Sequence, residues 1–420
     1  MTDISATASE ARLLAAIASL PRFPLGWLDT PLEAAPRLSA ALGGPPIFIK
    51  RDDLTGLSFG GNKTRMLEFS IADAQAKGAD TIVYGAAVQS NYCRQLAGAC
   101  AKAGFECHLV MRPEREIDKT QITGNGLVQR LLGAHVTVLP DNDRPRQQAA
   151  IQAKAAELRA AGKKVYLPRQ PDTIDLEALA YAISALELVQ QCRALGIEPK
   201  WLFVAAADTT QAGLVLGLKA IGSGLKVRGI NPSFHNGNEE RMAAMANQAA
   251  ERLDLDVTFT AADFDNDDSY VGERYGVPTA EGLAAISAVA QNEGILMDPV
   301  YTGKAMGALI DQIRSGKIGA DEPVVFLHTG GAPLCWQLTV ILLGFAFVFA
   351  PFHFLIWPGV GCPIAHPLDY RVQQFVETLH RLHCDQCKMQ ILNPRIALQI
   401  AGNVFAHQNK SQIFTVKIEH

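Results

Sequence analysis

Hydrophobic positions alternate between two patterns from about residue 45 to residue 333. Short runs rich in β-branched and aromatic residues predict buried strands, and longer Ala- and Leu-rich stretches with helical spacing separate them. The predicted strands are Ile47–Lys50, Thr81–Tyr84, Cys107–Met111, Val136–Leu139, Lys164–Leu167, Trp201–Val204, Lys226–Ile230 and Val324–Leu327. Leu176–Leu195 and Thr279–Asn292 have helical spacing, and other such stretches end in glycines suited to helix C-caps, namely Gly78, Gly104, Gly133 and Gly162.

This alternation predicts an α/β protein with mostly parallel sheets that carry helices on both faces. In such folds, ligand sites lie at the carboxyl ends of the strands. The pattern stops after Pro333. Leu338–Trp357 has no formal charge and reaches the length of a membrane span, although Pro351 and His353 interrupt it. We interpret residues 335–420 as an atypical tail that a frameshift or fusion explains better than a membrane anchor.

Charge and composition exclude several classes of protein. A net charge of −4 gives no electrostatic footprint for nucleic acid. Met1–Leu20 lacks the basic start and continuous apolar run of a signal peptide, and eight scattered cysteines suit a reducing cytoplasm. We therefore expect a cytoplasmic protein that acts on a small molecule. His380–Cys387 groups zinc-type ligands, but an isolated cluster of this kind is more often chance, and we predict no metal site.

A lysine at a helix start is the first candidate for chemistry. Thr55–Arg65 leads into the helical pattern Met66–Lys77, and its paired glycines allow a tight turn close to a ligand. Asn62 is the predicted N-cap, which places Lys63 in the first turn. A cation there opposes the helix dipole, but the positive helix end helps lower the pKa of an amine that must attack a carbonyl. An exposed lysine that tolerates a weak penalty is the plain alternative.

Ile49–Asp53 followed by Gly60–Arg65 resembles the D-cysteine desulfhydrase and 1-aminocyclopropane-1-carboxylate (ACC) deaminase family. This family is a branch of the tryptophan-synthase-β-like, fold-type II enzymes that use pyridoxal 5′-phosphate (PLP). The resemblance covers about residues 22–333. It implies that Lys63 carries PLP as a Schiff base, that Asn62 lies beside the cofactor and that the chain forms a homodimer.

The resemblance also implies two three-layer αβα domains. They are a large PLP-binding domain of residues 1–64 and 176–334, and a small domain of residues 65–175.

Gln89–Arg94 supplies a candidate substrate site. It follows the strand that ends near Tyr84 and opens the predicted helix Asn91–Ala103. Free backbone N–H groups and a hydroxyl at a helix start suit an anionic group such as a carboxylate. Ser90 as a simple N-cap is the plain alternative. The resemblance implies that a Gln-Ser-Asn element grips the substrate carboxylate, here Gln89, Ser90 and Asn91.

Thr209–Gly213 links the strand Trp201–Val204 to the predicted helix Ala212–Ala220. The resemblance implies that the PLP phosphate binds at this helix start, through Thr209 and Thr210, as phosphates do at helix N-termini generally. The sequence departs from the family here because the usual loop is richer in glycine. Asp208 would repel a phosphate unless its side chain points away.

Three further segments match the family in order, namely Gly272–Thr279, Leu296–Ala305 and Val324–Pro333. A single tyrosine is more often a half-buried packing residue. The resemblance nevertheless implies that Tyr275 lines the substrate site, that Tyr301 lies beside the cofactor ring and that Thr329 faces the pyridine nitrogen. We assign Lys63, Tyr275 and Tyr301 as catalytic residues.

Thr302 and Thr329 resemble the desulfhydrase pair, whereas ACC deaminases typically carry Glu and Leu at these positions. Thr302 is thereby assigned to substrate binding. The favoured reaction is α,β-elimination of D-cysteine or a related β-substituted amino acid to pyruvate, ammonia and sulfide. Met66, where the family often has Lys, leaves the substrate open. The alternatives are an ACC deaminase, a sulfo-amino-acid lyase, an inactive PLP-binding protein and a membrane-tethered protein.

Overall fold

A computed structural model describes residues 6–206, 208–331 and 333. The predicted tail 335–420, with its apolar run 338–357 and the cluster His380–Cys387, lies outside these residues. Within the described part of the chain, no helix is both long and apolar enough to cross a membrane.

The larger sheet has six strands in the order β1-β2-β10-β7-β8-β9. Neighbouring strands run parallel, except that β1 is antiparallel to β2. The bounds are β1 Leu32–Ala34, β2 Ile47–Lys50, β7 Trp201–Ala205, β8 Lys226–Ile230, β9 Asp265–Asp267 and β10 Val324–Leu327.

The smaller sheet has four parallel strands in the order β5-β4-β3-β6. The bounds are β3 Thr81–Tyr84, β4 Glu106–Met111, β5 His135–Val138 and β6 Val165–Tyr166.

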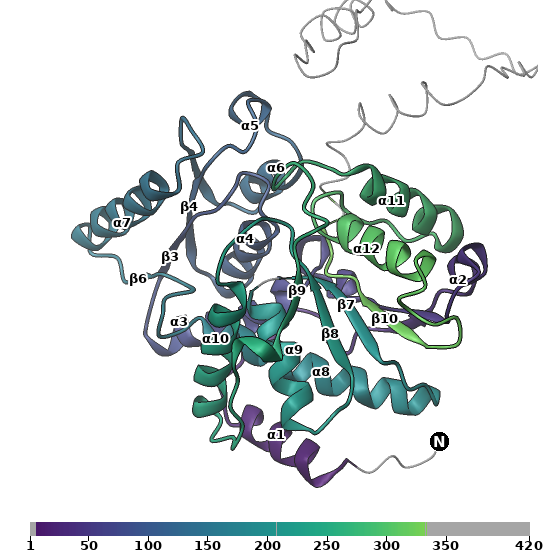
Figure 1. Ribbon diagram of the computed structural model, residues 1–420. Helices are drawn as coiled ribbons and strands as arrows, with labels where there is room; N and C mark the ends of the chain where they lie inside the picture. Colours follow the sequence, from purple (N-terminus) through teal and green to yellow (C-terminus); the bar gives the residue numbers. More distant parts are fainter. Residues whose placement is uncertain (1–5, 207, 332, 334–420) are drawn as a thin grey trace, which may run out of the picture. The chain divides into compact units, whose positions relative to one another are not determined.

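Helices cover both faces of each sheet (Figure 1). Alternate side chains of a strand point to opposite faces, so Val325 and Leu327 pack with α1, α8, α9 and α10, while Val324 and Phe326 pack with α2, α11 and α12. On the smaller sheet, α3 and α4 cover one face and α7 covers the other. The bounds are α1 Ala8–Ala18, α2 Pro36–Leu42, α3 Lys63–Ala76, α4 Asn91–Ala103, α5 Ile117–Thr120, α6 Gly124–Leu131, α7 Arg144–Ala160, α8 Asp175–Leu195, α9 Thr209–Ala220, α10 Asn238–Arg252, α11 Ala280–Glu293 and α12 Thr302–Arg314.

The predicted α/β class with mostly parallel sheets is therefore confirmed, and all eight predicted strands are present. The four predicted C-cap glycines all have positive φ. The pattern missed the two three-residue strands β1 and β9, and it placed the start of α9 too late. Helix α3 packs against both α4 and α8, so the division at residues 64 and 175 stays a prediction.

Candidate active site

Lys63 is the first residue of α3, and a turn of unusual backbone geometry leads into it. Ser58, Phe59, Gly60 and Gly61 all have positive φ, which is uncommon for the first two because they carry side chains. The buried guanidinium of Arg94, on α4, donates hydrogen bonds to the carbonyls of Ser58 and Gly60. The turn that presents the lysine is thus held from the neighbouring helix.

Asn62 occupies the position before α3, but its side chain does not cap the helix, contrary to the prediction. Its Nδ2 donates to Thr210 Oγ1 at 3.0 Å, and its backbone N–H donates to the Thr329 carbonyl at 3.0 Å. The Thr64 N–H donates to Gln95 Oε1 of α4 at 2.7 Å and to the Gly61 carbonyl at 3.2 Å. Asn62 therefore joins the start of α3 to the start of α9 and to the end of β10.

The half-buried Lys63 amine has a pKa lowered from 10.5 to about 8. Burial is the main cause because it disfavours the charged form, and the Arg169 guanidinium adds to it. The carboxylates of Asp208 and Glu177 act in the opposite direction. The lowered pKa agrees with the sequence argument, but burial and Arg169 produce it, whereas that argument relied on the helix dipole.

A charged cluster surrounds the start of α9, which begins at Thr209. The Arg169 guanidinium forms ion pairs with both Glu177 and Asp208, and it lies 5.3 Å from the ring centroid of Tyr92. Burial pushes the pKa of Asp208 upward, but Arg169 and Lys63 outweigh burial and lower it. The Asp208 side chain thus has its own counter-ion. Sequence reasoning gave no role to Arg169 or Glu177.

The two threonines at the start of α9 are buried, and both have protein contacts. Thr209 Oγ1 lies 3.5 Å from Glu177 Oε2, and Thr210 Oγ1 accepts the amide of Asn62. At the end of β10, Thr329 is 8% exposed, and its hydroxyl has no hydrogen-bond partner among the described residues. This hydroxyl is available to a ligand.

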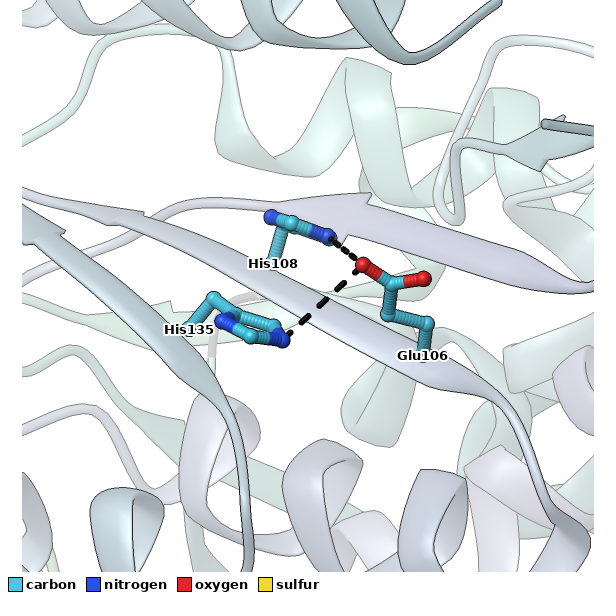
Figure 2. Close-up of side chains that lie close together, drawn as sticks. All are labelled: Glu106, His108 and His135. Atoms are coloured by element: carbon cyan, nitrogen blue, oxygen red, sulfur yellow. Dashed lines mark hydrogen bonds and ion pairs between the residues drawn. The ribbon is translucent and has the colours of Figure 1, made fainter. Parts of the chain in front are cut away.

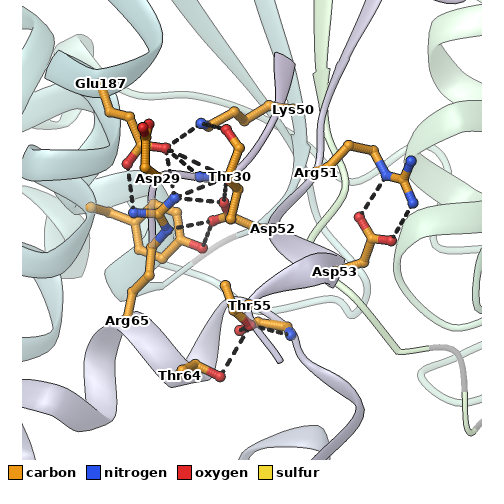
Figure 3. Close-up of polar contacts among 12 residues, drawn as sticks. Asp29, Thr30, Lys50, Arg51, Asp52, Asp53, Thr55, Thr64, Arg65 and Glu187 are labelled. Atoms are coloured by element: carbon orange, nitrogen blue, oxygen red, sulfur yellow. Dashed lines mark hydrogen bonds and ion pairs between the residues drawn. The ribbon is translucent and has the colours of Figure 1, made fainter. Parts of the chain in front are cut away.

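Two residues after Lys63, Arg65 anchors α3 in a buried ion network (Figure 3). Its guanidinium contacts Asp52 at 2.9 Å and Glu187 at 2.8 Å. Asp52 also accepts the Tyr181 hydroxyl at 2.6 Å, and Glu187 pairs with Lys50. Burial opposes the charge on Arg65, but the two carboxylates outweigh it and raise its pKa. The network fixes the helix that carries the lysine to β2 and α8.

The predicted carboxylate grip lies at the start of α4. Ser90 caps this helix, since its Oγ accepts the Cys93 N–H at 3.2 Å. This is the N-cap role that the plain alternative predicted. Asn125, near the start of α6, donates its N–H to Gln89 Oε1 at 3.0 Å and its Nδ2 to Asn91 Oδ1 at 2.9 Å. Asn125 thus holds Gln89 and Asn91, the two residues on either side of Ser90.

Tyr275 and Tyr301 lie together, with their hydroxyls hydrogen-bonded and their ring centroids 5.9 Å apart at 70°. Burial raises the pKa of both hydroxyls, so both stay protonated near neutral pH. The two tyrosines and Gln89 line one cavity of about 240 Å³. Lys63 and Thr329 are not among its lining residues.

Asp298 positions Tyr301, a role that the sequence reasoning missed. Its Oδ1 accepts the N–H groups of Val300 at 2.9 Å and Tyr301 at 2.7 Å, which fixes the start of α12. The Thr302 hydroxyl is fully buried and donates to Asp298 Oδ2 at 2.7 Å. This hydroxyl is committed to Asp298, so the structure does not support the predicted substrate contact of Thr302. An aspartate that accepts the backbone N–H groups two to four residues further on forms an Asx-turn type of contact, and the residue type is its local sequence signal.

The donor set fits PLP. A lysine amine with a lowered pKa lies beside a helix N-terminus, whose N–H groups suit a phosphate. Arg169 adds a guanidinium and forms an ion pair with the carboxylate of Asp208, which would otherwise repel the phosphate. The available Thr329 hydroxyl suits a ring nitrogen. Lys63, Thr209, Thr210 and Thr329 would hold the cofactor.

Comparisons with known proteins agree with this fit. D-cysteine desulfhydrases from Salmonella typhi and from Klebsiella pneumoniae (strain 342) are each 39% identical to this chain over 74% of it and 94% of their own length. The crystal structure of an ACC deaminase homologue is 32% identical, with a TM-score of 0.72 over 79% of this chain and 98% of that chain. Threonine deaminase isoform 2 from Solanum lycopersicum, 17% identical with a TM-score of 0.56, shares the fold. Residues 24–330 match the family described as pyridoxal-phosphate dependent enzyme, and the chain belongs to that family.

Proposed function

We propose that this chain is a PLP-dependent lyase that eliminates the β-substituent of D-cysteine, or of a similar small amino acid, and releases pyruvate, ammonia and that substituent, which is sulfide for D-cysteine. The observation that carries the proposal is the Lys63 amine, whose pKa of about 8 suits proton transfer near neutral pH. The relatives named D-cysteine desulfhydrase support the substrate class, since they align over 94% of their length.

When bound, PLP supplies the electron sink for removal of the α-proton. Lys63 takes that proton, because the turn held by Arg94 presents its amine and because burial makes the neutral form accessible. Asn62 fixes the position of Lys63 relative to the start of α9 and the end of β10. Thr329 would offer its hydroxyl to the ring nitrogen. A neutral hydroxyl does not force a proton onto that nitrogen, which suits elimination.

In this proposal the substrate carboxylate binds at the start of α4, where Gln89, Ser90 and Asn91 lie around the first turn. The free N–H groups of that turn and the Ser90 hydroxyl donate to it. Tyr275 and Tyr301, both protonated, close the site from the other side. One of the pair donates a proton to the departing sulfur, and the other orients it. Thr302 acts through Asp298 and not on the substrate.

ACC deamination is the second candidate, because the solved structure of an ACC deaminase homologue matches 79% of this chain. We further propose that the enzyme works as a homodimer in the cytoplasm, as its composition and the family resemblance suggest. Light scattering of the purified protein tests the dimer.

The test of function compares wild-type protein with Lys63→Ala and with Lys77→Ala. Lys77 follows the other end of α3 and serves as a matched control. We expect pyruvate release from D-cysteine, and slower or no ketoacid release from ACC, L-cysteine and cysteate. We expect Lys63→Ala to lose both turnover and the visible band of lysine-bound cofactor, and Lys77→Ala to keep both. If the protein shows the visible band but turns over ACC alone, the proposed reaction would be ACC deamination and not elimination. Turnover that persists in Lys63→Ala would refute the role of this lysine.

A further inference from the structure

Two imidazoles and one carboxylate converge on the smaller sheet, at the opposite end of β4 from the active-site loops. Glu106 and His108 are two residues apart on β4 and therefore share one face. His135 opens β5, and the parallel register pairs it directly with His108. Figure 2 shows all three side chains on that face, from two neighbouring strands. None of them contributes to the site described above.

The three ligand atoms have the spacing of a metal site. His108 Nε2 lies 2.7 Å from Glu106 Oε1, and His135 Nε2 lies 3.9 Å from the same oxygen. Bonds of about 2.0–2.1 Å in a tetrahedral zinc site hold neighbouring ligand atoms about 3.4 Å apart, between these two distances. The His135 side chain is 63% exposed and has room to adjust. The imidazole rings stack with centroids 4.6 Å apart and planes 17° apart, so the exposed His135 ring has to turn for its Nε2 to reach an ion that His108 also binds.

Glu106 has the charge state that a ligand needs. A carboxyl is ionised near neutral pH, as a metal ligand has to be. Lys163 Nζ occupies Oε2 at 2.6 Å and so leaves Oε1 to the two histidines. The same lysine places a positive charge near any bound cation, which weakens its binding.

We propose that Glu106 Oε1, His108 Nε2 and His135 Nε2 bind one divalent transition-metal ion of the Zn²⁺, Ni²⁺ or Cu²⁺ type, with water in the remaining position. Imidazole and carboxylate are the ligands that these ions share. The ion bridges β4 to β5, which is an edge strand of the smaller sheet. Its effect is on the stability of that edge, and the chemistry at Lys63 does not depend on it.

The test is a zinc titration of the full chain in competition with a chromophoric chelator. Wild-type protein is compared with His135→Ala, Lys163→Met and Thr137→Ala. Thr137 lies two residues from His135 on the same face of β5 and is not a ligand, so it is the matched control. Any zinc bound elsewhere on the chain is common to all four proteins and cancels in the comparison.

We expect wild-type and Thr137→Ala to bind one more equivalent of zinc at micromolar concentration than His135→Ala. Saturating zinc should raise the melting temperature of every protein except His135→Ala. Lys163→Met should bind several-fold more tightly, because a repelling charge is removed. The visible band of the cofactor and pyruvate release should be unchanged in all four, which confirms that each is folded.

Identical zinc-binding isotherms for wild-type and His135→Ala would overturn the proposal. The cluster would then be only a hydrogen bond between a histidine and a glutamate. Lys163→Met that binds no more tightly than wild-type would remove Glu106 from the ligand set.

Discussion

Replacing Lys63 by methionine should stabilise the cofactor-free protein at neutral pH, although it abolishes turnover. The lysine amine is half-buried near Arg169 and has no hydrogen-bond partner among the described residues, so its charged form is costly in the folded state. Methionine has a similar length and carries no charge. The gain in stability therefore measures what the fold gives up to keep a reactive amine in place.

The magnitude follows from the fall of the Lys63 pKa from 10.5 to about 8. At 1.36 kcal/mol per pH unit this fall is worth about 3.4 kcal/mol, and solvent screening of the half-buried side chain reduces it to about 2–3 kcal/mol. The folded pKa lies below the unfolded one, so the unfolded chain binds more protons between pH 8 and 10.5. The penalty is complete below pH 8 and disappears as the pH rises through 10.5.

The assay is urea unfolding of both cofactor-free proteins at pH 7 and pH 10. Burial of the apolar methionine side chain contributes the same free energy of unfolding at both pH values. The stability difference between Lys63→Met and wild-type should therefore change between pH 7 and pH 10 only through the titration of Lys63. Lys77→Met, just past the other end of α3, should differ from wild-type by no more than about 0.5 kcal/mol at either pH. A stability difference for Lys63→Met that is independent of pH would refute the lowered pKa.

Three further substitutions test the surroundings of this lysine. Tyr181→Phe removes a 2.6 Å hydrogen bond to the buried carboxylate of Asp52 and should lower the free energy of unfolding by about 1.5–3 kcal/mol, measured by calorimetry, with turnover retained. Gly61→Ala places a Cβ 2.7 Å from a side-chain nitrogen of α4 at a φ of +124°, so kcat should fall at least tenfold while the circular dichroism spectrum stays native. Asp208→Asn removes a negative charge beside the phosphate site and should tighten PLP binding several-fold in an absorbance titration; weaker binding would mean that Asp208 is needed to orient Arg169.

Several strands were predictable because they are buried on both faces. Val324–Leu327 is fully buried and appears in the sequence as a continuous apolar run. The two missed strands lie at the edges of the six-stranded sheet. One of them, Asp265–Asp267, is entirely polar, so no hydrophobic pattern marks it. The start of α9 was missed because its first two residues are threonines, which resemble a loop in sequence although both are buried.

The site was predictable only where its residues belong to local motifs. Lys63 and Ser90 occupy the helix starts expected of them, because the signals for a helix start lie within a few residues. Arg169 follows β6 in a loop with a φ of +61° and reaches the start of α9 only through the folding of distant segments. No spacing in the sequence connects it to Lys63.

In the proposed function, the charges around Lys63 explain how a helix start without glycine could serve as the phosphate site. Asp208 alone would repel a phosphate, but Arg169 pairs with it and with Glu177, so the cluster of Lys63, Arg169, Asp208 and Glu177 sums to zero when the amine is charged. Arg169 also lowers the pKa of Lys63, whereas the two carboxylates raise it. A single guanidinium thus offsets the repulsion at α9 and keeps the lysine amine reactive, and the loss of flexible glycines is balanced by a fixed charge.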